Sequence, residues 1–271
     1  MTLLEVDGLD VRYGDFQALS GVRLHVDQGR AMALIGANGA GKTTLLRTIA
    51  GALTGSAGRI RYDGTDITGA PPHRRIRQGI AMVPEGRRLF PSLTVEENIL
   101  IGASAAASPD WPLDRIYDTF PIIARRRRHR ASALSGGEQQ AVAIGRALAA
   151  GPSLLLLDEI SLGLAPRVIA ELYEMLAGLR AAGATLVIVE QDLQRALDAC
   201  DDLTCLLEGR VVLTGPAAGV QRDEVVAAYF GVSTAGRADG VPSPAPGPSG
   251  GPPGRRATGP AEPPGDSEGR P

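Results

Sequence analysis

The stretch Gly36-Ala37-Asn38-Gly39-Ala40-Gly41-Lys42-Thr43 decides the fold of this chain. It follows an apolar run, Ala31 to Ile35, that predicts a buried strand, and it opens a helical pattern over Lys42 to Ala52. A glycine-rich turn in that context, ending in Lys-Thr, is the phosphate-loop (Walker A) pattern. Its backbone N–H groups curl around phosphates, and the helix N-terminus adds favourable dipole charge. The predicted nucleotide-binding residues are Gly36, Asn38, Gly39, Ala40, Gly41, Lys42, Thr43 and Thr44.

Two acidic residues, Asp158 and Glu159, end a second predicted strand that starts at Leu154. Open α/β sheets bind ligands at the carboxyl ends of their strands, so this pair should lie beside the phosphate loop. Lys42 would reach the β- and γ-phosphates, and Thr43 and Asp158 would hold Mg²⁺ directly or through water. Glu159 is placed to polarise the attacking water as a general base.

The rest of the chain predicts an α/β fold in which strands alternate with helices around a mostly parallel sheet. A third strand is predicted over Ala184 to Val189, and helices over Gly137 to Ala150, Pro166 to Ala182 and Leu193 to Ala199. Leu4 to Asp27 instead predicts two antiparallel strands around a turn at Tyr13-Gly14-Asp15. Between about residues 90 and 134 a capping box at Thr94 to Glu97 and a segment from Pro112 to Phe120 predict a small helical insert.

The predicted folded domain spans residues 1–232. From Ser233 to Pro271 Gly and Pro make up about half of the residues, which predicts a disordered tail. A formal charge of -2 and a pI near 6.0 give no global attraction to nucleic acid or to an acidic membrane. No run of about 18 apolar residues predicts a membrane span, and no signal peptide is expected. Cys200 and Cys205 are expected to be buried thiols.

Two basic clusters stand out, one at His73-Arg74-Arg75 with Arg77 and one from Arg125 to Arg130. The plain interpretation of each is a solvated helical face. For the second cluster, contact with the loops and phospholipids of a membrane partner is the alternative. Nucleic-acid binding is disfavoured, because aromatic residues make up only 4% of the chain and none interleaves with the arginines.

A further motif, Leu134-Ser135-Gly136-Gly137-Glu138-Gln139-Gln140, lies between the phosphate loop and the acidic pair. With it, residues 3 to about 230 resemble the ATPase subunits of ABC transporters, a family with the P-loop NTPase fold. The resemblance implies that Tyr13 stacks on adenine, that Glu85 stands at the Q-loop position near Mg²⁺ and the attacking water, and that Gln191 replaces the switch histidine. It also implies that Ser135, Gly136 and Gly137 act on an ATP held by another subunit, because this signature motif works across a dimer.

Three stretches narrow the resemblance: Val83-Pro84-Glu85-Gly86-Arg87-Arg88, Ser161-Leu162-Gly163-Leu164-Ala165-Pro166 and Val189-Glu190-Gln191. They are similar to the LivF-type ATPase of branched-chain amino acid importers, although Ile160 departs from the proline usual there. The resemblance implies a peripheral subunit at the cytoplasmic face of the membrane that hydrolyses ATP. Its implied partners are a second, LivG-like ATPase, two membrane permease subunits and a solute-binding protein, with no nucleic acid.

Other interpretations remain open from the sequence. Related subunits serve importers of urea, amides or other solutes. A soluble ABC ATPase acting on nucleic acid or ribosomes usually has two cassettes in one chain or a long coiled-coil insertion, and neither is present here. A regulatory subunit that binds ATP without hydrolysing it is the third alternative.

Overall fold

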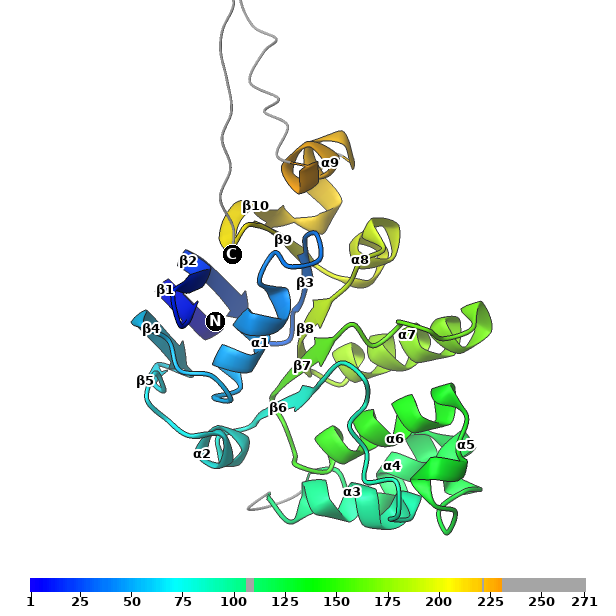
Figure 1. Cartoon of the computed structure of the whole chain (residues 1–271). Coiled ribbons are helices and arrows are strands. Elements are labelled where there is room, and N and C mark those ends of the chain that lie inside the picture. The colour runs from blue at the N-terminus through cyan, green and yellow to red at the C-terminus, as the bar shows by residue number, and fades with distance from the viewer. Residues whose placement is uncertain (106–109, 221, 231–271) are drawn as a thin grey trace, which may run out of the picture. The chain divides into compact units, whose positions relative to one another are not determined.

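The computed structural model describes residues 1–105, 110–220 and 222–230, so the predicted tail lies outside the described residues. Its centre is a six-stranded sheet in the order β10-β9-β3-β8-β7-β6 (Figure 1). The strands are β3 (Ala31–Ile35), β6 (Ile80–Val83), β7 (Leu154–Asp158), β8 (Thr185–Val189), β9 (Asp202–Leu207) and β10 (Arg210–Pro216). Neighbouring strands pair in parallel except β9 and β10, which confirms the predicted mostly parallel sheet.

Both faces of β3, β7 and β8 are buried, which explains why these strands are almost entirely apolar. Successive side chains of β3 alternate between two cores: Ala31, Ala33 and Ile35 join one, whereas Met32 and Leu34 join the other. The same alternation divides the four leucines of β7 and the apolar residues of β8. Because β3, β7 and β8 pair in parallel, the residues that follow these three strands all emerge at one edge of the sheet.

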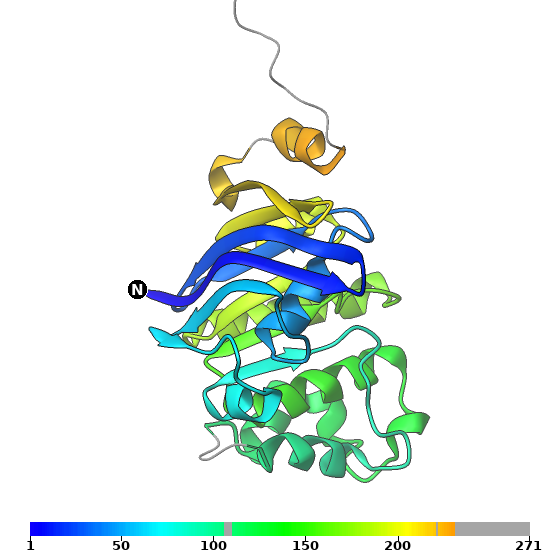
Figure 2. The same cartoon turned by 60° about the vertical axis from the view of Figure 1, so that its left-hand side comes forward.

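An antiparallel sheet in the order β2-β1-β4-β5 covers one face, with α1 (Lys42–Ile49) between the two sheets (Figures 1 and 2). Its strands are β1 (Thr2–Tyr13), β2 (Phe16–Asp27), β4 (Ala57–Tyr62) and β5 (Thr65–Asp66). The hairpin of β1 and β2 confirms the antiparallel addition predicted at the N-terminal end. The sequence prediction missed β4 and β5, as well as β6, β9 and β10 of the central sheet.

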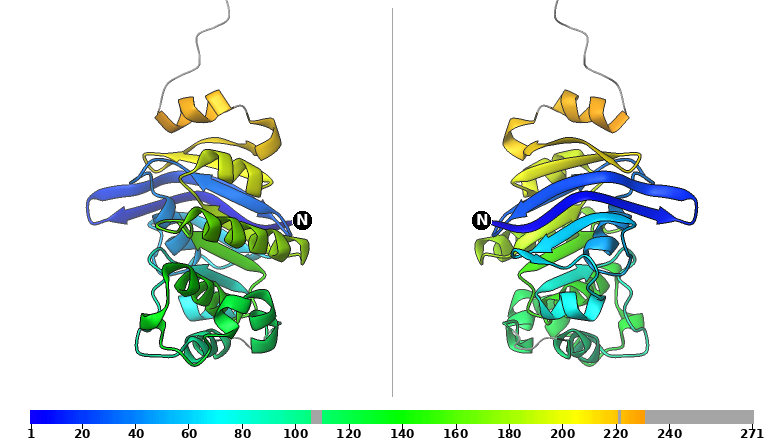
Figure 3. Two further views of the ribbon diagram at one scale, coloured as in Figure 1. Left: turned by 90° about the vertical axis from the view of Figure 1, so that its right-hand side faces the viewer. Right: turned by 90° about the vertical axis from the view of Figure 1, so that its left-hand side faces the viewer.

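Helices cover the other face of the central sheet (Figure 3). They include α6 (Gly136–Leu148), α7 (Pro166–Ala181) and α8 (Leu193–Ala199), each within two residues of its predicted bounds. The helices α3 (Val95–Ala103), α4 (Leu113–Thr119) and α5 (Pro121–Ala124) pack beside α6 at one end of the molecule (Figure 1). Helices α2 (Pro72–Arg77) and α9 (Arg222–Phe230), with 3-10 turns at Ala131–Ala133 and Ala217–Gly219, complete the described elements. Among the described residues no helix has the length and apolar character that crossing a membrane requires.

One residue of the first basic cluster departs from the expected solvated face, whereas His73, Arg74 and Arg77 are exposed as expected. Arg75 lies on α2 (Pro72–Arg77) and is only 2% exposed. Its guanidinium donates to the backbone oxygens of Thr48 and Ile49, both at 2.7 Å, and to those of Ala70 and Thr68. The planar guanidinium, with its five N–H donors, satisfies carbonyls at the end of α1. The sequence pattern alone does not distinguish the buried Arg75 from the exposed Arg74.

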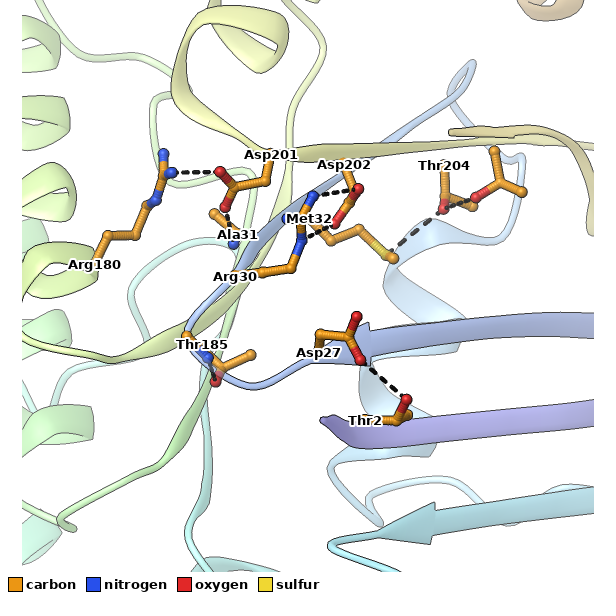
Figure 4. Close-up of polar contacts among 12 residues, drawn as sticks. Thr2, Asp27, Arg30, Ala31, Met32, Arg180, Thr185, Asp201, Asp202 and Thr204 are labelled. Atoms are coloured by element: carbon orange, nitrogen blue, oxygen red, sulfur yellow. Dashed lines mark hydrogen bonds and ion pairs between the residues drawn. The ribbon is translucent and has the colours of Figure 1, made fainter. Parts of the chain in front are cut away.

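A set of polar contacts fixes the amino-terminal ends of the central strands (Figure 4). Arg30 forms a two-pronged ion pair with Asp202, at 2.7 and 2.8 Å. Asp201 accepts from Arg180 on α7 at 2.6 Å and from the backbone N–H of Ala31 at 2.8 Å. These bonds tie β3, β9 and α7 together at the end of the sheet opposite the phosphate loop.

Candidate nucleotide-binding site

The phosphate loop connects β3 to α1, and its glycines are required by space and by backbone conformation. A Cβ on Gly36 would lie 2.3 Å from the backbone oxygen of Leu206, and one on Gly41 would lie 2.6 Å from a methyl carbon of Leu19. Gly39 has open space around it but a φ of 84°, which L side chains rarely adopt. No side chain caps the N-terminus of α1 at Gly41, so its first N–H groups are available to an anion.

Lys42 is 4% exposed and bends back over its own loop. Its ammonium donates to the backbone oxygens of Gly36 at 2.7 Å and Ala37 at 3.1 Å, and it lies 3.9 Å from a carboxylate oxygen of Glu159. Burial lowers the pKa of Lys42, and the charges of Glu159 and Asp158 oppose that shift. A buried cation with carbonyl partners at its tip is placed to neutralise a phosphate group in the loop.

Asp158 ends β7, is fully buried and accepts from the Thr43 hydroxyl at 3.1 Å. Its second oxygen, Oδ2, is buried and has no hydrogen-bond partner among the described residues. Burial raises the pKa of Asp158, and the nearby Glu159 and Glu85 add to this against the Thr43 bond. A cation would relieve both the unpaired oxygen and the local negative charge. Mg²⁺ keeps water and phosphate oxygens as ligands, so one hydroxyl and one carboxylate from the protein fit its needs.

Glu159 has a φ of 48°, a left-handed conformation that is strained for a residue with a side chain. Gln191, the second residue after β8, donates from its amide to Glu159 Oε2 at 2.7 Å. The sequence predicted these two residues just after two separate strands, and the structure pairs those strands and brings the two side chains into direct contact. The bond leaves the other carboxylate oxygen of Glu159 facing Lys42.

A cavity of about 570 Å³ is lined by ten of the predicted residues. Nine of them come from the phosphate loop, α1 and the ends of three strands: Asn38, Gly39, Gly41, Lys42, Thr43, Thr44, Glu85, Glu159 and Gln191. Tyr13 also lines the cavity, with its hydroxyl 3.4 Å from that of Thr44 and its side chain 47% exposed. The sequence analysis missed Phe16, which is 67% exposed at the start of β2 and extends the aromatic wall beside Tyr13. The signal in the sequence that could have found Phe16 is its place two residues after Tyr13, directly across the Gly14-Asp15 turn.

The segment after Glu85 turns sharply through three left-handed residues. Gly86, Arg87 and Arg88 have φ values of 73°, 64° and 44°. Arg146 of α6 holds this turn by donating to the backbone oxygens of Arg88 at 2.8 Å and Arg87 at 3.0 Å. Arg87 in turn donates to Gln139 at 3.3 Å. The turn that follows Glu85 is therefore tied to α6 through Arg87 and Arg88.

The signature residues do not line the cavity. Ser135 caps α6, accepting from the Glu138 N–H, while its own N–H and hydroxyl donate to the Glu138 carboxylate at 2.8 and 2.9 Å. Gly137 packs against α7, where a Cβ would lie 2.6 Å from Val168. The N-terminus of α6 is thus built and capped, but its N–H groups lie outside the site formed by Lys42 and Glu159.

The fold, the phosphate loop with its acidic strand end, and the separate signature helix define an ATP-binding cassette ATPase. The chain matches the ABC transporter family over residues 19–161 and belongs to that family.

Two relatives come from one organism, Pseudomonas aeruginosa. The chain is 45% identical to its high-affinity branched-chain amino acid transport ATP-binding protein BraG, over 84% of this chain and all of BraG. It is 29% identical to the protein of the same description called BraF, over 84% of this chain and 98% of BraF.

Among solved structures, the chain resembles the dimeric post-hydrolysis state of the ATP-binding cassette MJ0796 bound to ADP and Pi. The TM-score is 0.71 at 25% identity, covering 80% of this chain and all of that one.

Proposed function

We propose that this chain is the ATP-hydrolysing subunit of an importer for branched-chain, hydrophobic amino acids. The observation that carries the proposal is the agreement between the site and the relative. Lys42, Glu159 and Gln191 line one cavity beside the phosphate loop. BraG, whose full length is matched by this chain, is described as a branched-chain amino acid transport ATP-binding protein. Residues 1–232 would form the ATPase domain, with the helices between about residues 90 and 134 as its insert.

In the proposed hydrolysis of ATP each side chain of the site has its own role. Lys42 and the free N–H groups of α1 hold the phosphates, and Tyr13 and Phe16 offer aromatic faces to the base. The Glu159 carboxylate draws a proton from water, whose oxygen attacks the γ-phosphorus while the bond to the β,γ-bridging oxygen breaks. Gln191 keeps Glu159 oriented. Mg²⁺, held by Thr43 and Asp158 with Glu85 nearby, would balance the phosphate charge.

The proposed partner subunit is inferred from the signature residues, which do not contribute to this chain's own ATP site. Ser135, Gly136 and Gly137 lie outside the cavity, so we propose that they complete the ATP site of a second ATPase subunit. Pseudomonas aeruginosa has two proteins of this description, and the chain is much more similar to BraG than to BraF. This supports a heterodimer with a BraF-like (LivG-like) sister. Membrane permease subunits, a solute-binding protein and a position at the cytoplasmic face of the membrane complete the proposal.

The test is amino acid uptake in the organism that encodes the chain. Deletion of the gene should abolish high-affinity uptake of labelled leucine, and the full chain should restore it. Lys42→Ala should not restore it, because the phosphates lose their cation. If deletion leaves leucine uptake unchanged while the purified chain still hydrolyses ATP, branched-chain amino acids are not the substrate. That result would favour an importer of urea or another solute. Absence of Lys42-dependent phosphate release would instead favour a subunit that only binds ATP.

A further inference from the structure

Glu190 is a buried carboxylate for which the proposed reaction has no direct use. It follows β8, lies immediately before Gln191 and is 2% exposed. Burying a carboxylate costs several kcal/mol unless hydrogen bonds and opposite charge compensate. Its partners therefore indicate what the residue does.

The compensation comes from three elements. The Tyr173 hydroxyl on α7 donates to Oε1, and the Ser161 hydroxyl, on the loop after β7, donates to Oε2 at 3.0 Å. The guanidinium of Arg195, on α8, lies 3.8 Å from Oε2 and 3.5 Å from the Ser161 oxygen. The carboxylate thus joins α7, α8 and the loop that begins at Glu159.

These bonds close a ring around the general base. Glu159 is bonded to Gln191 through their side chains, Gln191 follows Glu190 in the chain, and Glu190 bonds Ser161, which is two residues after Glu159. Glu159 is strained at a φ of 48°. Such a conformation persists only where its surroundings fix it. The buried Glu190 carboxylate bonds Ser161, and its backbone carries Gln191, so Glu190 fixes both residues that hold Glu159 in place.

We propose that Glu190 is a positioning residue that holds Glu159 and Gln191 in register by bonding Ser161 and anchoring both to α7 and α8. The proposal rests on the proposed function for its effect on turnover, but its structural part stands on these contacts alone. Loss of the ring would leave the phosphate loop intact, so nucleotide binding and hydrolysis should separate.

The experiment compares variants of the full chain at opposite ends of the central sheet. Glu190→Ala and Ser161→Ala break the ring, whereas Glu190→Gln keeps its shape and one acceptor. Asp201→Ala is the matched control, because Asp201 also bonds an α7 side chain, Arg180, but at the opposite end of the sheet (Figure 4). The first readout is hydrogen exchange of the nucleotide-free protein.

Exchange in residues 158–163 should rise by about tenfold in Glu190→Ala and Ser161→Ala, and not in Asp201→Ala. The Ser161 variant removes only one hydroxyl, so it decides the question even if Glu190→Ala does not fold. Unchanged exchange in Ser161→Ala, or an equal rise in the Asp201 variant, would overturn the proposal, because Glu190 would then be a general anchor.

The second readout is turnover in the assembled complex at equal folded fraction. The same two variants should lower kcat by about ten- to a hundredfold with unchanged affinity for ATP, and Glu190→Gln should recover part of the loss. Equal kcat in the ring variants and the control would contradict the positioning role. A wild-type chain without hydrolysis would count against the proposed function instead, and the exchange data would still decide the fate of the ring.

Discussion

At the residue scale, the two cysteines show how burial controls chemistry. Burial raises the pKa of Cys200 to about 12 and that of Cys205 to about 11, and the side chains are 8% and 0% exposed. The thiolate is the reactive form, so near neutral pH the folded protein holds both cysteines as neutral thiols.

We therefore expect both cysteines to resist a disulfide reagent at pH 8 in the native protein. Both should react within minutes in denaturant, where their pKa values return to about 8.5. The measurement is colorimetric titration of free thiols with and without urea. Rapid labelling of one thiol under native conditions would contradict the burial found here.

A second residue-scale contrast is Arg75 against its neighbour Arg74. Arg75 satisfies four backbone carbonyls in the interior, whereas Arg74 is exposed. Arg75→Ala should lower the free energy of unfolding by about 3 kcal/mol or more, because buried carbonyls lose their donor. Arg74→Ala should change it by no more than about 0.5 kcal/mol. Urea unfolding of the two variants measures the difference, and equal effects would refute the structural role of Arg75.

At the scale of elements, two helices begin with the same capping box. Thr94 with Glu97 starts α3, and Ser135 with Glu138 starts α6, each with reciprocal bonds between side chain and backbone. Local sequence determines this arrangement, since each box needs only residues three apart. The two boxes differ in what lies beyond them, because only α6 begins at the signature motif.

Thr94→Ala and Ser135→Ala should each cost about 1 kcal/mol of stability, which is typical for the loss of an N-cap. Only Ser135→Ala should also lower ATP turnover of the assembled complex, because the Ser135 hydroxyl is proposed to face the partner's ATP. Thermal unfolding and phosphate release measure the two effects. A similar fall in turnover for Thr94→Ala would show that stability, and not the signature contact, explains the result.

At the scale of the whole molecule, the separation of the signature from the cavity predicts association that depends on ATP. In Glu159→Gln the amide is a poor base, so turnover should fall by about a hundredfold or more while ATP stays bound. The bound γ-phosphate would then hold two subunits together.

Size-exclusion chromatography with Mg²⁺ and ATP should show a dimer of Glu159→Gln, either alone or with the sister ATPase co-expressed. The double variant with Lys42→Ala should remain monomeric under the same conditions, because ATP no longer binds tightly. Absence of any ATP-dependent dimer in both mixtures would refute the shared site. The comparison of the two mixtures also distinguishes a homodimer from a heterodimer.

The sequence predicted the parts of this molecule that depend on neighbours in the chain. The phosphate loop, the acidic pair after β7, the buried strands β3, β7 and β8 and the capping box at Thr94 to Glu97 are local patterns of glycine, charge or apolar residues. It missed β5 and β6, which are short, and β4 and β10, which are largely exposed, because such strands have little pattern of their own. It also missed the buried β9, in which the polar residues Asp202 and Thr204 interrupt the apolar run. It also missed Phe16 and treated Arg75 as exposed, because exposure depends on what packs against a residue.

The sequence by itself therefore determined the class of fold, the chemistry and the residue types of the nucleotide site. Only the tertiary structure decided that Gln191 bonds Glu159, that Arg146 holds the strained turn after Glu85, and that Glu190 joins Ser161 to two helices. Each of these contacts joins residues about 30 to 60 positions apart in the chain. Such pairs meet only when the sheet brings its strand ends to one edge, so no local pattern encodes them.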